Sequence, residues 1–198
     1  MGKSKSFWLM MGGEVAPPEE TISILTTTAG NRGNTDYVWS NARNETDGLN
    51  TSNNLSWYSV GSNPYSIYRC HLFFPKPNFD NVIGCQIVLD MTGSGVGTDT
   101  PQDGYLYDFT GVGGGTSGVA TDFSAFTTQL SDLTAGNDFA ITFTLNTAGV
   151  NYINNATGDV GFMVRSDNDV EDDSNVKPRS FFPKAGNIVT SYIKYIYQ

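Results

Sequence analysis

The single histidine of this sequence, His71, limits the kinds of catalysis that the chain can support. A serine or cysteine nucleophile with a histidine base would have to use this residue. His71 lies within the apolar run Ile67–Phe74, which is typical of a central β-strand. We expect a structural histidine there, and a zinc site would need further histidine or cysteine ligands. The sequence therefore predicts a protein that is not an enzyme of these types.

Carboxylates are the other groups that could do chemistry. Asp90, Asp99, Asp103 and Asp108 border predicted loops, where two of them could act as the acid pair of a glycosidase. Loop acids are more often solvated, and we expect no hydrolase.

The densest acidic run, residues 166–173, contains Asp167, Asp169 and Glu171 at every second position. In an extended loop these carboxylates could converge on a hard cation such as Ca²⁺, which takes oxygen ligands. The run lacks the glycine and the terminal glutamate spacing of an EF-hand. We favour a solvated acidic loop, so no cofactor is expected and Ca²⁺ is the one metal ion considered.

Arg69 and Arg165 lie inside strand patterns, among apolar neighbours. An arginine buried in such a place must be paired, so we expect carboxylate partners and a structural role in the core.

Trp39, Trp57 and Tyr58 flank the polar loops of residues 41–65. Exposed aromatic rings could stack on sugars and form a glycan platform, whereas buried rings would belong to the core, which is the commoner case.

The elements that must position these groups are β-strands. From Thr21 onward, short runs rich in Ile, Val, Thr, Tyr and Phe are separated by clusters of Gly, Asn, Asp and Ser. This pattern predicts an all-β, jelly-roll-like sandwich of two antiparallel sheets over residues 21–198. The candidate strands are Thr21–Thr27, Asp36–Trp39, Leu55–Val60, Ser66–Phe74, Gly84–Met91, Gly104–Phe109, Ala140–Leu145, Val160–Arg165, Arg179–Phe182 and Ile188–Tyr197.

Helix is expected only as short turns, at Phe123–Leu130 and at Thr147–Asn155, the second capped by Asn146 or Thr147. The two apolar stretches Ile67–Phe74 and Val82–Met91 should be central strands. If they form a hairpin, Cys70 and Cys85 lie opposite one another and could form a disulfide, although two buried thiols are the favoured alternative.

Residues 1–20 differ from the rest and are expected to form an extended N-terminal arm, which ends at Pro17-Pro18. The arm carries the apolar cluster Phe7, Trp8, Leu9, Met10 and Met11. Soluble proteins seldom expose such a patch. We expect these residues to dock on a neighbouring subunit, with packing against their own domain as the alternative.

Charge and hydropathy exclude further classes. The chain has 198 residues, 11 basic and 20 acidic, for a net charge of −9. An acidic surface repels a phosphate backbone, so a nucleic-acid partner is not expected. No run approaches the roughly 18 apolar residues of a membrane span, so a membrane protein is not expected either.

The order of several segments resembles a β-sandwich module of phage virion and bacterial surface proteins, of the DNRLRE type or carbohydrate-binding-module-like. The matching segments are Ile67–Phe74, Val82–Leu89, Asp103–Tyr107, Thr121–Phe126, Phe143–Asn154, Gly161–Arg165 and Ile193–Tyr197. Pro75 stands where the family usually has Asp, and the Asp-Asn-Arg-Leu-Arg-Glu string itself is missing.

The resemblance implies a non-catalytic unit of assembly or attachment. Our leading hypothesis is a virion structural protein, a capsid decoration or fibre-like accessory subunit, which binds capsid or other virion proteins through its arm and forms a homo-oligomer. The alternatives are a carbohydrate-binding module for a host-surface glycan and an extracellular subunit of a surface filament or layer.

Overall fold

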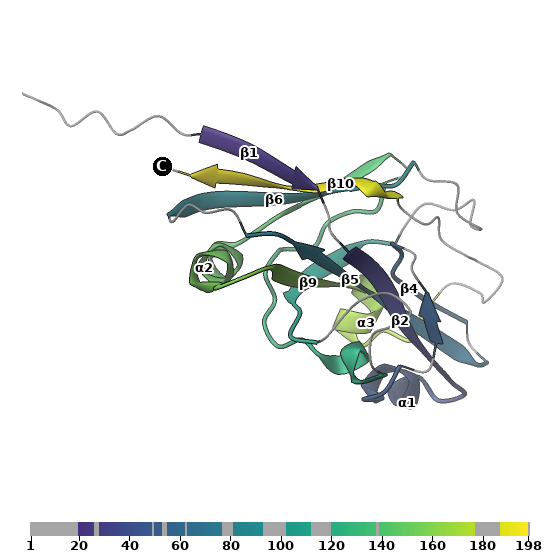
Figure 1. Ribbon diagram of the computed structural model, residues 1–198. Coiled ribbons are helices and arrows are strands. Elements are labelled where there is room, and N and C mark those ends of the chain that lie inside the picture. Colours follow the sequence, from purple (N-terminus) through teal and green to yellow (C-terminus); the bar gives the residue numbers. More distant parts are fainter. Residues whose placement is uncertain are drawn as a thin grey trace, which may run out of the picture.

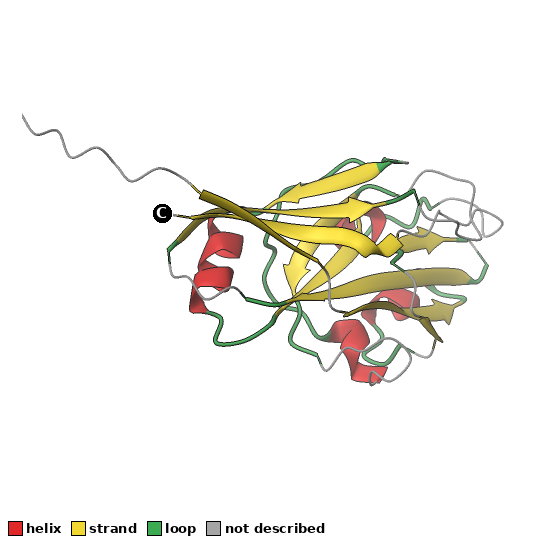
Figure 2. Ribbon diagram, turned by 45° about the horizontal axis from the view of Figure 1, so that its top comes forward, coloured by secondary structure: helices red, strands yellow, loops and turns green. Residues whose placement is uncertain are grey.

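Two antiparallel sheets pack face to face and form the body of the part of the chain that the structure describes (Figure 1). The computed structural model describes residues 20–25, 28–48, 50–52, 55–61, 63–76, 81–92, 102–111, 120–137, 139–176 and 187–197. Within these residues helices are short, as Figure 2 shows. The prediction of an all-β, two-sheet sandwich is confirmed.

The four-stranded sheet joins the two ends of the described chain. Its strands, in spatial order, are β1 (Glu20–Leu25), β10 (Asn187–Tyr197), β6 (Val82–Asp90) and β8 (Ala140–Thr144). Because β1 and β10 are antiparallel, Glu20 lies opposite Tyr197.

The six-stranded sheet has β5 and β9 at its centre. In spatial order it contains β3 (Asn50–Ser52), β2 (Thr28–Asp36), β5 (Tyr65–Phe74), β9 (Val160–Ser166) and β7 (Gly104–Asp108), with β4 (Tyr58–Val60) also paired to β5. The helices are α1 (Trp39–Asn44), the 3₁₀ turn η2 (Ala120–Ser124), α2 (Thr147–Asn155) and α3 (Asp167–Glu171).

The main core lies between the sheets and follows the period of two expected of strands. In β8, Ile141 and Phe143 are buried while Thr142 and Thr144 are exposed. The expectation that Ile67–Phe74 is a central strand is confirmed, because β5 lies between β2 and β9 and is buried along most of its length. β6 is central as expected, but its outward side chains are only half-buried and Ile83 is 39% exposed.

Several local predictions were wrong. The expected strand Asp36–Trp39 is instead a turn into a helix: β2 ends at Asp36, whose carboxylate accepts the N–H of Val38 at 2.7 Å, and α1 begins at Trp39. In Phe123–Leu130 only the first two residues belong to a helical element, the end of η2.

The two cysteines lie on different sheets. Cys70 belongs to β5 and Cys85 to β6, so these strands do not form the hairpin that would have brought the two thiols together. Both side chains are buried free thiols in the main core.

Parts of the sequence-based interpretation lie outside the described residues. These are the arm cluster Phe7–Met11 and the candidate strand Arg179–Phe182. The first strand begins at Glu20, one residue before the expected start of the sandwich. None of the helices described is both long and apolar enough to span a membrane.

Candidate functional site

The outer face of the six-stranded sheet is covered by α1, η2 and α3. Along β5, residues alternate between the two faces: Cys70 and Leu72 point into the main core, whereas Ile67 packs with Trp39 of α1 and Phe123 of η2. Arg69 lies two residues from Ile67 and therefore points to the same outer face. This layer brings together charged side chains that are far apart in the sequence.

A buried carboxylate, Asp169, holds two arginines of this layer. Arg69 donates from Nε to Oδ2 at 2.7 Å and from Nη2 to Oδ1 at 2.8 Å. Arg165 donates from Nε to Oδ2 at 2.8 Å and from Nη2 to Oδ1 at 3.0 Å. Both guanidinium groups use the two-pronged geometry that suits a carboxylate. The expectation that each buried arginine has a carboxylate partner is confirmed, with one carboxylate serving both.

The electrostatics of this cluster reflect its burial. Burial by itself would raise the pKa of Asp169, but the two guanidinium groups outweigh that effect and hold the pKa well below its usual range. Burial lowers the pKa of Arg69 although Asp169 acts to raise it, and the smaller effects of the positive charges of Arg165 and Arg43 also lower this pKa. Two guanidinium groups and one carboxylate carry a net charge of 2 − 1 = +1.

A third arginine, Arg43 at the end of α1, closes the layer. Its Nε donates to the backbone carbonyl of Asp169 at 2.7 Å and lies 3.6 Å from Oδ1 of Asp172. Trp39 donates from its indole N–H to the same Asp172 oxygen at 2.9 Å. These contacts fasten α1 to α3.

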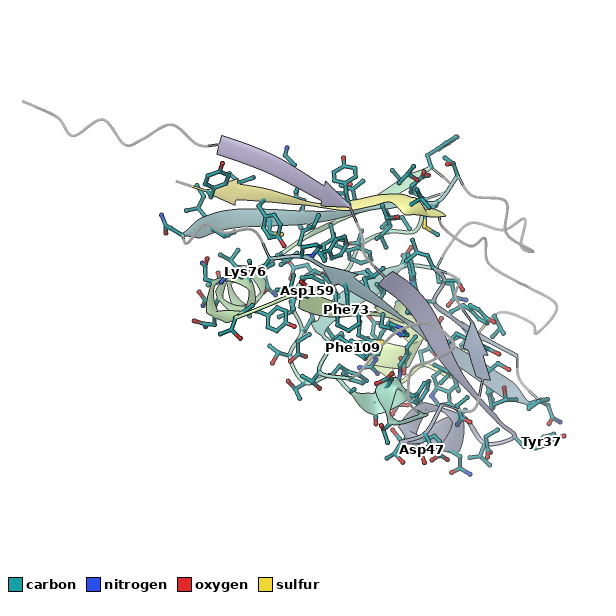
Figure 3. All side chains as sticks on the ribbon, in the orientation of Figure 1. Tyr37, Asp47, Phe73, Lys76, Phe109 and Asp159 are labelled. Carbon is teal, nitrogen blue, oxygen red and sulfur yellow. The ribbon has the colours of Figure 1, made fainter. Side chains whose placement is uncertain are left out.

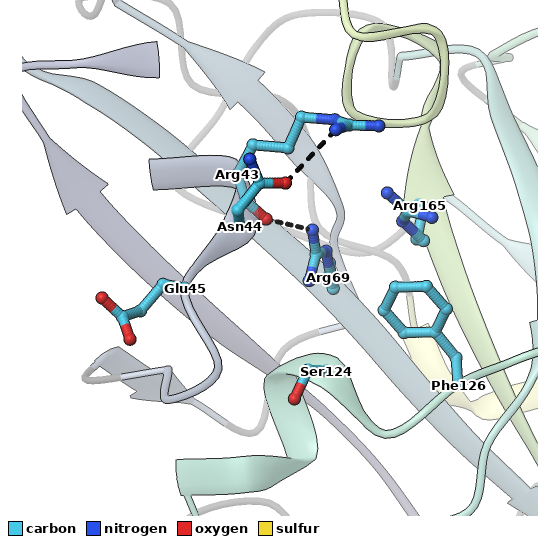
Figure 4. Close-up of a pocket in the computed structure, with 7 residues that line it drawn as sticks. All are labelled: Arg43, Asn44, Glu45, Arg69, Ser124, Phe126 and Arg165. Carbon is cyan, nitrogen blue, oxygen red and sulfur yellow. Dashed lines mark hydrogen bonds between the residues drawn. The ribbon is translucent and has the colours of Figure 1, made fainter. Parts of the chain in front are cut away.

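The three arginines line one pocket of about 300 Å³, drawn in Figure 4. Arg69 and Arg165 are almost fully buried and form its floor, while exposed side chains form its rim. Phe126 makes an apolar wall, with its ring centroid 4.4 Å from Cζ of Arg165. The remaining lining residues are Asn44, Glu45 and Ser124.

The acidic run was assigned the wrong conformation. Residues Asp167–Glu171 form the helix α3, which begins after the N-cap Ser166. Asp169 faces inward to the arginines, whereas Glu171 is exposed and accepts a hydrogen bond from the Tyr105 hydroxyl at 2.9 Å. The three carboxylates therefore do not converge as an extended loop would allow. Among the described residues, no group of three or more His, Cys, Asp or Glu side chains is placed to hold a metal ion.

The three aromatic residues considered for a glycan platform lie apart. Trp57 is 1% exposed, donates its indole N–H to the carbonyl of Gln102 at 3.0 Å, and belongs to the main core. Trp39 is buried on the opposite face of the six-stranded sheet. Tyr58 is half-buried and stacks on Tyr68 with centroids 4.5 Å apart. These residues do not form one exposed surface.

His71 is fully buried, and its ring stacks on Phe109 with centroids 5.1 Å apart. Phe73 and Phe109, labelled in Figure 3, pack edge to face beside it. The histidine is thus part of an aromatic layer, with no exposed surface at which to meet a substrate.

Sequence reasoning did not single out Arg43 or the pocket. Arg43 lies 26 residues from Arg69, and Asp169 lies 100 residues from it, so no short motif links them. The sequence did contain a chemical signal for the cluster. Two arginines in strand patterns needed carboxylate partners, and Asp169 was already noted in the acidic run.

Neither models of known protein families nor curated protein sequences match this chain. The relation to virion and surface modules therefore stays a proposal.

Proposed function

We propose that this protein is a non-enzymatic structural subunit of a virion, a capsid decoration or fibre-like accessory protein anchored through Phe7–Met11. The observation that carries the proposal is the position of β1 in the sandwich. β1 is an edge strand of the four-stranded sheet, and it is hydrogen-bonded to β10. In the sequence, the apolar cluster precedes this strand.

In the described part of the chain, the burial and pairing of the reactive side chains also support a structural role. His71 is packed among aromatic rings, both thiols are buried, and Asp169 is held by two arginines. These groups stabilise the sandwich from within. A subunit that must survive as part of a particle benefits from such internal pairing.

The glycan-binding alternative has weaker support, because Trp57 and Trp39 are buried. A subunit of an extracellular filament or layer belongs to the same assembly class as the leading proposal. The two differ in where the chain is found, so isolating the particle that carries it separates them.

The test is co-sedimentation of the chain with intact particles from cells that produce it. We expect a fixed copy number per particle and a homo-oligomer when the particle is absent. Burying one large apolar side chain contributes roughly 1.5–3 kcal/mol, so a chain lacking residues 1–16 should fold normally but fail to sediment with particles.

The matched control replaces Lys3 and Lys5 with Gln, which changes the arm but keeps its apolar cluster. This variant should sediment like the unmodified chain. Undiminished incorporation of the deleted chain would refute arm anchoring, and loss of folding would show that the arm belongs to the sandwich core.

A further inference from the structure

Among the described residues, the buried group on the floor of the arginine-lined pocket has more positive than negative charge, and Glu45 lies only on the exposed rim. Arg69, Arg165 and Asp169 form a buried group with a net charge of +1, as worked out above. Arg43 is neutralised separately by Asp172 at 3.6 Å. A buried excess charge is costly unless it is paired, so this group favours one negative charge in the pocket beside it.

The donors of the arginines suit a carboxylate. The bonds of Arg165 to Asp169 use Nε and Nη2 and leave Nη1 outside the pair. In Arg69, Nη2 donates to Asp169 and to the carbonyl of Arg43 at 2.9 Å, whereas Nη1 donates one of its two N–H groups to the carbonyl of Phe123 at 2.8 Å. N–H groups of two guanidiniums at one pocket floor can bind the two oxygens of a carboxylate.

The size and rim of the pocket restrict the ligand. About 300 Å³ is the lower limit of small-molecule pockets and suits one side chain. Glu45 on the rim and the overall charge of −9 oppose a dianion such as phosphate or a polyanion. A ligand group with a single negative charge therefore fits this pocket best.

The surroundings point to a protein as the source of that charge. Tyr37 and Val38 immediately precede α1 and are 74% and 51% exposed, and the pocket begins at the last turn of the same helix. Figure 3 places Tyr37 at this end of the molecule. Tyrosine and arginine, here at the two ends of one short helix, are both enriched in protein interfaces.

We propose that the pocket between α1, η2 and the six-stranded sheet binds one acidic side chain of a partner protein, whose carboxylate is held by Arg69 and Arg165. The choice of a protein ligand rests on the proposed role in assembly. Arg43 and Phe126 would confine the side chain, and Tyr37 and Val38 would contact the partner around it.

The test is a titration of the full chain with acetyl-Gly-Glu-Gly-amide, followed by NMR of the arginine Nε–H signals. We expect these signals to shift with the Glu peptide and to stay unchanged with acetyl-Gly-Gln-Gly-amide. Arg43→Gln removes one positive charge from the pocket wall and should weaken binding about threefold, the effect of a partly exposed charge pair. Glu45→Gln, which leaves the buried cluster intact, should strengthen binding about twofold.

The matched control is Lys194→Gln on the four-stranded sheet, which should bind like the unmodified chain. Equal binding of the Gln peptide, or equal weakening by Lys194→Gln, would overturn the site. Tighter binding of glucuronate than of the Glu peptide would overturn the protein ligand and assign the pocket to acidic sugars. These titrations use the isolated chain, so they are independent of whether the chain sediments with particles.

Discussion

Replacing Asp169 with Asn tests how much of the fold depends on the buried charge cluster. The substitution keeps the size of the side chain but removes its negative charge. In the native protein this carboxylate accepts four hydrogen bonds from the two arginines. Two guanidinium groups would then remain buried, with exposures of 2% and 7%, and without their shared counter-ion. Removing one partner of a buried pair typically costs about 3–5 kcal/mol.

Such a loss is a large share of the 5–15 kcal/mol by which a domain of this kind is stable. Urea unfolding followed by tryptophan fluorescence measures it directly. With a slope of about 1–3 kcal/mol per molar urea, the midpoint should fall by about 1 M or more. The matched control is Asp172→Asn, whose side chain is 61% exposed and pairs with Arg43 at 3.6 Å. That change should cost about 0–1 kcal/mol.

The stability of Asp169→Asn should also depend on pH less than the stability of the unmodified chain does. The pKa of Asp169 is lowered by the fold, whereas the unfolded carboxyl titrates near 3.9. The unfolded chain therefore binds the proton first, and the stabilisation by Asp169 is present above about pH 4 and is lost as the pH falls below it. Acid should destabilise the unmodified chain more than Asp169→Asn. Equal acid sensitivity, or a cost of Asp169→Asn no larger than that of Asp172→Asn, would refute the reasoning.

Two further predictions concern local structure and the thiols. Asn146 caps α2 by accepting the N–H of Gly149 at 3.0 Å, so Asn146→Ala should cost about 1 kcal/mol in urea unfolding, whereas Asn151→Ala on the exposed side of the helix should cost less. Burial raises the pKa of the Cys70 and Cys85 thiols, so Ellman's reagent at pH 8 should react with neither in the native protein and with both in urea; rapid native reaction would contradict their burial.

Local signals in the sequence were sufficient where neighbours along the chain decide the structure. The helix Thr147–Asn155 was predicted with its boundaries, because Asn146 is a strong N-cap and Ile153 faces the core. The alternation in β8 likewise identified its buried face. Both features depend on residues only a few positions apart.

Prediction failed where contacts between residues far apart in the sequence decide the structure. The inward position of Asp169 depends on Arg69, which lies 100 residues earlier in the chain. The Cys70–Cys85 hairpin was inferred from two consecutive strands, yet the chain crosses between sheets there. The pocket depends on α1, whose start is set by one aspartate side chain at a position that strand propensity had assigned to β.

The position of β10 has a consequence for synthesis on the ribosome. This strand lies between β1 and β6, so β1 meets its neighbour only after residues 187–197 have left the exit tunnel. Until then β1 and β6 each present an unsatisfied backbone edge, which is a template for pairing with other chains. A product that stops before Asn187 should therefore aggregate more readily than the chain that includes β10.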